Sequence, residues 1–223
     1  DAKLSLSLIG QLPGHASADQ ERDAFLLAQV SSAGEQAYFL PLAKIADSNS
    51  ASVRPILNAT PTSTLTRVRQ GPVISMLSDA AALDSFALTL LHHLQSESRL
   101  PIAEGEIRFA KHVQEHAQAH AQAHNWQPSL PRETEISRPA HAQGNSTIVI
   151  HDVAAIKLLR EMTPAPHPAL DMAHHLQQAD FRHTPALIGS ASIERADGSS
   201  TPWLLAYEFV HHQGDGWQWS LDR

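Results

Sequence analysis

Hydrophobic and polar residues alternate along much of the first part of the chain, which is the spacing of a strand with one buried face. Strands are expected where this alternation, or a short apolar run bounded by turn residues, occurs: 4–8, 25–30, 37–42, 64–70 and 72–77. The segment Ala33-Gly34-Glu35 and Gly71 fit the turns of two hairpins. The polar, proline-containing segment 47–63 is expected to be a surface loop with one short strand.

A helical spacing replaces this alternation after Asp79. Apolar residues then recur at intervals of three and four: Leu83, Phe86, Ala87, Leu90, Leu91 and Leu94. Asp79 is a suitable N-cap, and the helix is predicted to run through Gln95. The first ninety-odd residues therefore predict a β-rich unit closed by one helix, and no catalytic pattern occurs in it.

The last third of the chain begins with a hairpin pattern. A short polar loop, Gly144 to Thr147, leads into the apolar run Ile148 to Ile150. A turn at His151 and Asp152 follows, and the return run carries one cation, Lys157. This pattern predicts two paired strands with a small-residue loop at one end.

A helix and a second hairpin follow. Residues 166–181 have helical spacing, with Pro168 in the first turn and Asp171 at the flank of the apolar stripe. Strands are predicted at 185–195 and 201–210, on either side of an Asp-Gly turn. The order of elements is therefore loop, lysine hairpin, acid-bearing helix and second hairpin.

Together these patterns predict an α+β protein. Three segments are distinguished: a β-rich unit at 1–98, an intermediate segment at 99–143, and a unit with an antiparallel sheet and one main helix at 144–223. The intermediate segment contains a predicted strand at 104–111, an Ala-, Gln- and His-rich helix, and a proline-bearing connection.

Composition narrows the class of protein. The chain has 223 residues, 42% of them hydrophobic and 17% charged, as in soluble globular proteins. A formal net charge of -7 argues against nucleic-acid binding, which depends on clustered Lys and Arg. No apolar run approaches the roughly 20 residues that cross a bilayer, and no secretory signal pattern occurs. Cysteine is absent, which fits the reducing cytoplasm, so a cytoplasmic protein with no membrane partner is expected.

The intermediate segment offers one candidate metal site. Four histidines recur four residues apart on the predicted helix: His112, His116, His120 and His124. Such spacing places the imidazoles on one helix face, where pairs can chelate a transition metal. No carboxylate is interleaved to complete a closed site, however, and an exposed polar face explains the same pattern. We therefore predict no physiological metal site.

The lysine hairpin is the candidate site for chemistry. Nucleotide phosphates are bound by backbone N–H groups that approach closely and by a cation on a rigid element. The small-residue loop before Ile148 and the strand lysine Lys157 supply both. The alternative is that Lys157 is an edge lysine that points into water, and that Asp171 is a solvated charge on its helix.

From Gly144 onwards the sequence resembles maltokinases, particularly those fused to trehalose synthase. GNSTIVI resembles that family's phosphate loop, AIKLLREM its lysine strand, HPALDMAHHL its acid-bearing helix, and YEFVHHQGDGW its hinge. Upstream, FLLAQV, AYFLPLA and SMLSDAAALDSFALTLL are similar to the family's N-terminal cap domain. The resemblance implies a cap at 1–98 and, at 144–223, the small lobe of a protein-kinase-like, aminoglycoside-phosphotransferase-like fold.

The resemblance also implies roles for single residues. Asn145, Ser146 and Thr147 would lie over the phosphates of ATP, Lys157 would contact them, and Asp171 would pair with Lys157. Main-chain groups near Glu208 and Val210 would bind adenine. The chain departs from the family where Asp171 replaces the usual glutamate, where Ala142 and Gln143 replace an acidic residue, and in the order of the loop residues Gly-Asn-Ser-Thr.

The activity implied is the transfer of phosphate from ATP to maltose, giving maltose 1-phosphate in trehalose and glycogen metabolism. In such kinases the catalytic aspartate, the Mg²⁺ ligands and the sugar pocket belong to the large lobe, which would follow Arg223. We therefore expect no catalytic residue in this chain, and expect the isolated chain to be inactive. The partners expected are its own large lobe and, in a fused protein, trehalose synthase. The alternatives are a docking module without catalysis, and part of a related sugar kinase such as a glucosamine kinase.

Overall fold

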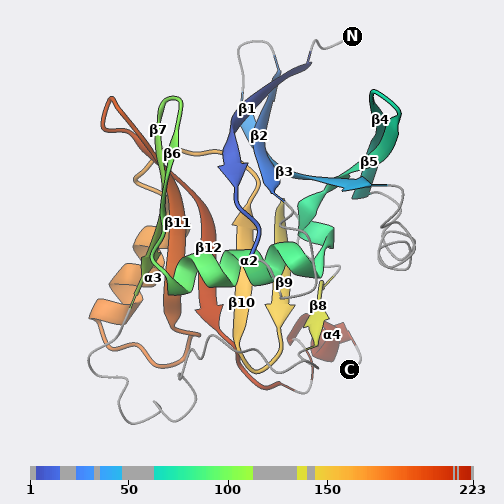
Figure 1. Ribbon diagram of the computed structural model, residues 1–223. Helices are drawn as coiled ribbons and strands as arrows, with labels where there is room; N and C mark the ends of the chain where they lie inside the picture. The colour runs from blue at the N-terminus through green and yellow to red at the C-terminus, as the bar shows by residue number, and fades with distance from the viewer. Residues whose placement is uncertain are drawn as a thin grey trace.

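Two antiparallel sheets and a few helices make up the protein in a computed structural model (Figure 1). The structure describes residues 4–15, 24–32, 36–46, 63–112, 135–139, 144–212, 214 and 216–221. Within these residues no helix is both long and apolar enough to cross a bilayer.

The first sheet contains the five strands predicted from the first part of the chain. Its members, in spatial order, are β1 (Leu4–Leu12), β2 (Phe25–Ser32), β3 (Ala37–Ala46), β5 (Val73–Asp79) and β4 (Thr64–Gln70). The predicted hairpins are confirmed, because β2 pairs with β3 and β4 pairs with β5. Most of the loop predicted at 47–63 lies outside the described residues.

The helix that closes this unit starts later than predicted. Asp79 caps a 3-10 turn, η3 (Ala80–Ala82), by accepting a 2.9 Å hydrogen bond from the amide of Ala81. The α-helix α2 (Asp84–Gln95) begins only after Leu83, whose extended backbone interrupts the helix. The prediction that Asp79 caps the long helix is therefore wrong, although the predicted apolar stripe is fully buried.

The second sheet has seven strands. In spatial order they are β6 (Arg99–Ile102), β7 (Gly105–Lys111), β11 (Leu187–Arg195), β12 (Ser200–Glu208), β10 (Ala154–Leu159), β9 (Asn145–Ile150) and β8 (Ile136–Ser137). Three of these strands come from the predicted intermediate segment, and β7 pairs with β11. The three-part division of the chain stays a prediction.

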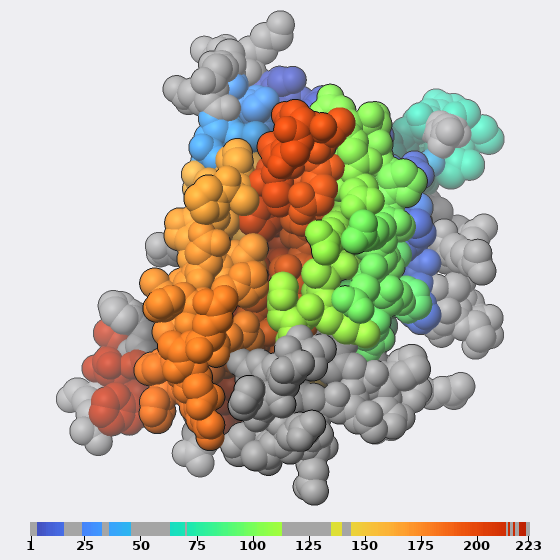
Figure 2. Space-filling view, turned by 90° about the vertical axis from the view of Figure 1, so that its left-hand side faces the viewer, coloured from blue at the N-terminus to red at the C-terminus, as the bar shows by residue number. Residues whose placement is uncertain are grey.

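Each face of the second sheet is covered by a different helix. Helix α2 packs on the face that carries Ile156 and Leu158 of β10, within a core that also takes in residues of the first sheet. Helix α3 (Pro168–Gln178) packs on the opposite face, where a smaller cluster forms around Leu159, Leu187 and Leu205. In the space-filling view α3 lies on one side of β11, and β6 and β7 lie on the other side of β11 (Figure 2). A short helix, α4 (Gly216–Leu221), follows the sheet.

The lysine-bearing strand β10 leads directly into the first sheet. The amide of Phe39 in β3 donates a 2.6 Å hydrogen bond to the carbonyl of Arg160. The amide of Met162 donates a 2.9 Å hydrogen bond to the carbonyl of Ala37. The ring of Phe39 also packs on Trp203 of β12, with 4.7 Å between the ring centroids. The two sheets are thus joined by main-chain hydrogen bonds and share one core.

Candidate functional site

Lys157 lies near the middle of β10, with a strand on either side of it. Its cross-strand partners are Thr147 of β9 and Leu205 of β12. Lys157 alternates with Ile156 and Leu158, which face the α2 side of the sheet, so its side chain belongs to the α3 side. The predicted lysine strand is confirmed, and the side chain is half-buried.

Apart from Thr147, the neighbours of Lys157 on this face are apolar. Ala155 precedes it by two residues, and Val149 and Tyr207 lie directly opposite Ala155 on the flanking strands. All three are half-buried, and the pKa of Tyr207 is raised because burial disfavours its charged form. The face therefore presents a cation beside half-buried apolar side chains, which suits a ligand with an anionic end and an aromatic end.

The three residues predicted to form a loop over phosphates belong instead to strand β9, which starts at Asn145. Their polar side chains did not prevent strand pairing. The three residues continue the ladder between β9 and β10 without a break, and their partners, in order, are Leu159, Leu158 and Lys157. Alternation places Thr147 on the face of Lys157 and Ser146 on the other face. There the hydroxyl of Ser146 accepts a 2.9 Å hydrogen bond from Nε of Arg160.

Asp171 lies in the first turn of α3 and is exposed to solvent. Among the described residues no ion pair or hydrogen bond joins it to Lys157. Helical geometry explains the separation, since Ala169, Leu170 and Ala173 face the sheet and position 171 falls on the far side of the helix. Met172 of the same helix is 58% exposed for a similar reason.

Glu208 and Val210, predicted to present main-chain groups to adenine, mark the end of β12. Glu208 is the last residue of the strand, and its amide donates a 2.9 Å hydrogen bond to the carbonyl of Ala186. Val210 lies two residues beyond the strand, with 48% of its surface exposed. Both positions follow Tyr207, so they continue from the apolar end of the Lys157 face.

The predicted histidine ladder is described only at His112, because His116, His120 and His124 lie outside the described residues. Nε2 of His112 is 2.8 Å from the hydroxyl of Ser190, and its ring lies against that of His174, with 4.9 Å between centroids. Burial, and to a lesser extent the neighbouring His174, lowers the pKa of His112 to about 4. Within the described part of the chain no group of three potential ligands could hold a metal ion.

The structure adds residues that sequence reasoning missed. Ala155 could have been found from strand alternation, because it lies two residues before Lys157. Val149, Tyr207 and Leu205 could not, since their place beside Lys157 depends on the register between strands. Arg160 gave no signal in the sequence, yet its guanidinium connects the two sheets.

Comparisons with known proteins bear on this arrangement. No protein-family model matches the chain. Among curated proteins, the chain is similar to a glucosamine kinase of Mycolicibacterium smegmatis (strain ATCC 700084 / mc(2)155), with 28% identity over 79 residues. The match covers 35% of this chain and 20% of that protein.

Solved structures of glucosamine kinases match almost the whole chain. One, in complex with glucosamine, ADP and inorganic phosphate, matches 98% of this chain at 15% identity with a TM-score of 0.53. Another, in crystal form B, matches the same share at 14% identity and the same TM-score. The chain covers 39% and 38% of those two proteins, so it spans about two fifths of their length. Its fold is therefore similar to that of part of a glucosamine kinase.

Proposed function

We propose that this chain forms the nucleotide-binding part of an ATP-dependent sugar kinase. The observation that carries the proposal is the position of Lys157 on a central strand, beside Thr147 and next to the apolar surface of Ala155, Val149 and Tyr207. A strand lysine that contacts phosphates, followed by an acid-bearing helix, is the arrangement of kinase small lobes. The similarity to glucosamine kinases supports the same class.

The parts of the site would divide the nucleotide between them. Lys157 would contact the phosphates, together with main-chain groups of the segment Asn145 to Thr147. Adenine would lie on the surface formed by Val149, Ala155 and Tyr207. Its edge would meet the main chain near Glu208 and Val210, where a carbonyl and an amide can pair with the base.

Two further components belong to the active state of the enzyme. In kinases the lysine and the helix acid pair only when the helix is correctly positioned. Asp171 faces away from the sheet here, so we propose that α3 turns in the nucleotide-bound protein and brings Asp171 to Lys157. Bound Mg²⁺ would neutralise charge on the phosphates. Its ligands, the catalytic base and the sugar pocket would lie in the part of such kinases that this chain does not cover.

The sugar acceptor distinguishes two versions of the proposal. The comparisons favour glucosamine over the maltose predicted from the sequence, because the relatives found are described as glucosamine kinases. Maltose as acceptor, fusion to trehalose synthase and a place in glycogen metabolism stay predictions. ADP release by the full-length protein, measured with glucosamine and with maltose in parallel, would decide between the two acceptors.

The lysine provides the test of the nucleotide role. In the full-length protein, Lys157→Ala should reduce sugar-dependent ADP release by at least about a hundredfold, because the charge that orients the phosphates is removed. Lys111→Ala is the matched control, since Lys111 is an exposed lysine on β7 of the same sheet. Calorimetric titration with ATP and magnesium should show weaker binding for the first variant alone. Near-normal activity of Lys157→Ala would refute the proposal and favour the docking-module alternative.

A further inference from the structure

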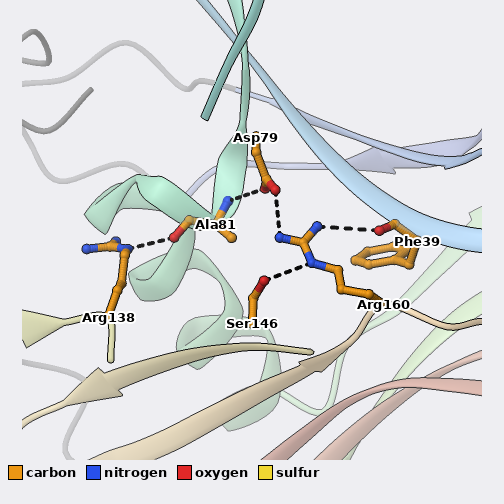
Figure 3. A network of polar contacts seen from close by, with 6 residues as sticks. All are labelled: Phe39, Asp79, Ala81, Arg138, Ser146 and Arg160. Atoms are coloured by element: carbon orange, nitrogen blue, oxygen red, sulfur yellow. Dashed lines mark hydrogen bonds and ion pairs between the residues drawn. The ribbon is translucent and has the colours of Figure 1, made fainter. Parts of the chain in front are cut away.

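Arg160 lies at the junction of the two sheets, directly after the lysine strand. Its guanidinium makes three contacts: Nη2 with Oδ2 of Asp79 at 2.6 Å, Nε with the hydroxyl of Ser146 at 2.9 Å, and Nη1 with the carbonyl of Phe39 at 3.4 Å (Figure 3). Asp79 and Phe39 belong to the first sheet, and Ser146 belongs to β9 of the second. One side chain thus connects three strands of two sheets.

A second arginine reaches the same part of the first unit. Nε of Arg138 donates a 2.6 Å hydrogen bond to the carbonyl of Ala81 (Figure 3). Nη1 of Arg138 also lies 2.8 Å from Oδ1 of Asp84. Asp79 in turn accepts from the amide of Ala81. The segment Asp79–Asp84, hereafter the anchoring turn, therefore holds Arg138, just after β8, and through Arg160 it also holds Ser146, near the start of β9.

Burial makes the Arg160 contacts stronger than an ordinary surface ion pair. The side chains of Arg160 and Asp79 are 16% and 23% exposed, whereas those of the pair Arg182–Asp180 are 71% and 67% exposed. Exposed pairs contribute little because water and salt screen them. A partly buried guanidinium that makes several charge-assisted hydrogen bonds has a fixed position, and lysine cannot reproduce its geometry.

The anchored residues are close neighbours of the proposed nucleotide site. Ser146 directly precedes Thr147, the cross-strand partner of Lys157. Arg160 follows Lys157 by three residues, and its main-chain carbonyl is bonded to Phe39. Ser146 and its bond to Arg160 are nevertheless on the face of the sheet opposite to Lys157. The network can therefore act on the site only through the placement of β9 and β10.

We propose that Arg160 is a positioning residue through which the anchoring turn of the first sheet sets the register and rigidity of the strands that bind nucleotide. This inference rests on the proposed nucleotide role of Lys157. It also has a reciprocal consequence, because two linked sites affect each other equally. Nucleotide bound at Lys157 stabilises β3 and β5 of the first sheet, and loss of the Asp79–Arg160 pair weakens nucleotide binding.

The test compares Arg160→Lys with Arg182→Lys in the full-length protein. Arg160→Lys keeps the charge but loses the simultaneous bonds to Asp79, Ser146 and Phe39. We expect the KM for ATP to rise about tenfold, with a much smaller change in kcat. Arg182→Lys, which alters only an exposed pair, should leave both constants unchanged.

Amide hydrogen exchange provides a second readout that does not depend on activity. In Arg160→Lys the amides of 145–150 and 154–159 should exchange faster, while those of 187–195 should not. In the wild-type protein, ATP should slow exchange in 37–46 and 73–79, and this distant protection should disappear in the variant. A residue with a merely structural role would lower stability without changing the response of the first sheet to ATP.

The outcomes separate this inference from the proposed function. If ATP does not bind to the wild-type protein, the proposed function fails, and faster exchange of β9 and β10 in Arg160→Lys alone decides whether the anchoring turn holds these strands. Unchanged exchange there, or an unchanged KM where ATP does bind, would overturn the inference. Should Arg160→Lys fail to fold, Asp79→Asn replaces it. This variant removes the negative charge that pairs with Arg160 but keeps an oxygen that can accept the hydrogen bond from the amide of Ala81. The same outcomes then apply.

Discussion

A single added methyl group at Gly105 should destabilise the second sheet strongly. Gly105 is the first residue of β7 and lies opposite Arg195 at the end of β11. Its φ is +150°, which side-chain-bearing residues rarely adopt. A Cβ at this position would lie 1.9 Å from the carbonyl oxygen of Glu194 and 2.9 Å from Cα of Arg195. Both atoms are backbone, so no rotation of a side chain can relieve the overlap.

The cost of Gly105→Ala can be estimated from these two effects. An unfavourable backbone conformation costs about 1–3 kcal/mol, and overpacking against a rigid neighbour costs about 1–3 kcal/mol more. The free energy of unfolding should therefore fall by about 2–6 kcal/mol, which is a large part of the roughly 5–15 kcal/mol that stabilises a typical protein.

Urea denaturation followed by circular dichroism would measure this loss, with Gly198→Ala as the control. Gly198, in the β11–β12 turn, has a φ of +84° but no atom within 4 Å of an added Cβ. The free energy of unfolding of Gly198→Ala should fall by only about 1–2 kcal/mol, from conformational strain alone. A Gly105→Ala protein no less stable than Gly198→Ala would contradict this prediction, because the backbone overlap would then have no measurable effect.

Three further predictions concern other parts of the protein. The pKa of His112 is about 4 in the folded state and ordinarily about 6.5. The folded protein therefore binds fewer protons, and stability should fall as the pH is lowered from about 6.5 to 4, by about 1–2 kcal/mol after allowance for partial solvent contact. His112→Gln should flatten this dependence in urea titrations at several pH values, and an unaltered pH profile would contradict the assignment. Leu90→Ala should lower the free energy of unfolding by about 2–5 kcal/mol, since Leu90 of α2 is fully buried, and a loss below about 1 kcal/mol would show that the core refills the cavity. Ala155→Leu, on the half-buried face beside Lys157, should weaken ATP binding at least about tenfold without lowering the melting temperature, and normal ATP affinity would place the base elsewhere.

Much of the fold could be predicted from local sequence patterns. The alternation at 4–8, the hairpin signal around Gly71 and the apolar stripe of α2 all identify their elements correctly. Such signals succeed because a half-buried strand or helix must repeat its apolar residues with the period of its own geometry. The α+β reading is consistent with the structure, which is mostly sheet with few helices.

The candidate site was harder to predict because it depends on distant pairings. Lys157 was identified from its own strand, but the neighbours that define its face come from β9 and β12. The register between strands cannot be deduced from the sequence of one strand alone. Ser146 illustrates the limit: its polarity favoured a loop, while its bond to Arg160 accounts for a polar residue inside a strand. Asp171 shows a second limit, because order along the chain did not reveal on which side of α3 it lies.

The pairing of β7 with β11 has a consequence for folding during synthesis, because β7 leaves the ribosome long before β11. His112, the residue that follows β7, is hydrogen-bonded to Ser190 in β11, 78 residues later in the chain. At about 5–20 residues per second, a ribosome needs on the order of 4–16 seconds to synthesise that interval. Throughout this time Ile107 and Phe109, which are fully buried in the finished protein, have no β11 to pack beside. The nascent chain therefore carries a β6–β7 hairpin with one unpaired edge and an apolar face, which is a natural substrate for chaperones during synthesis.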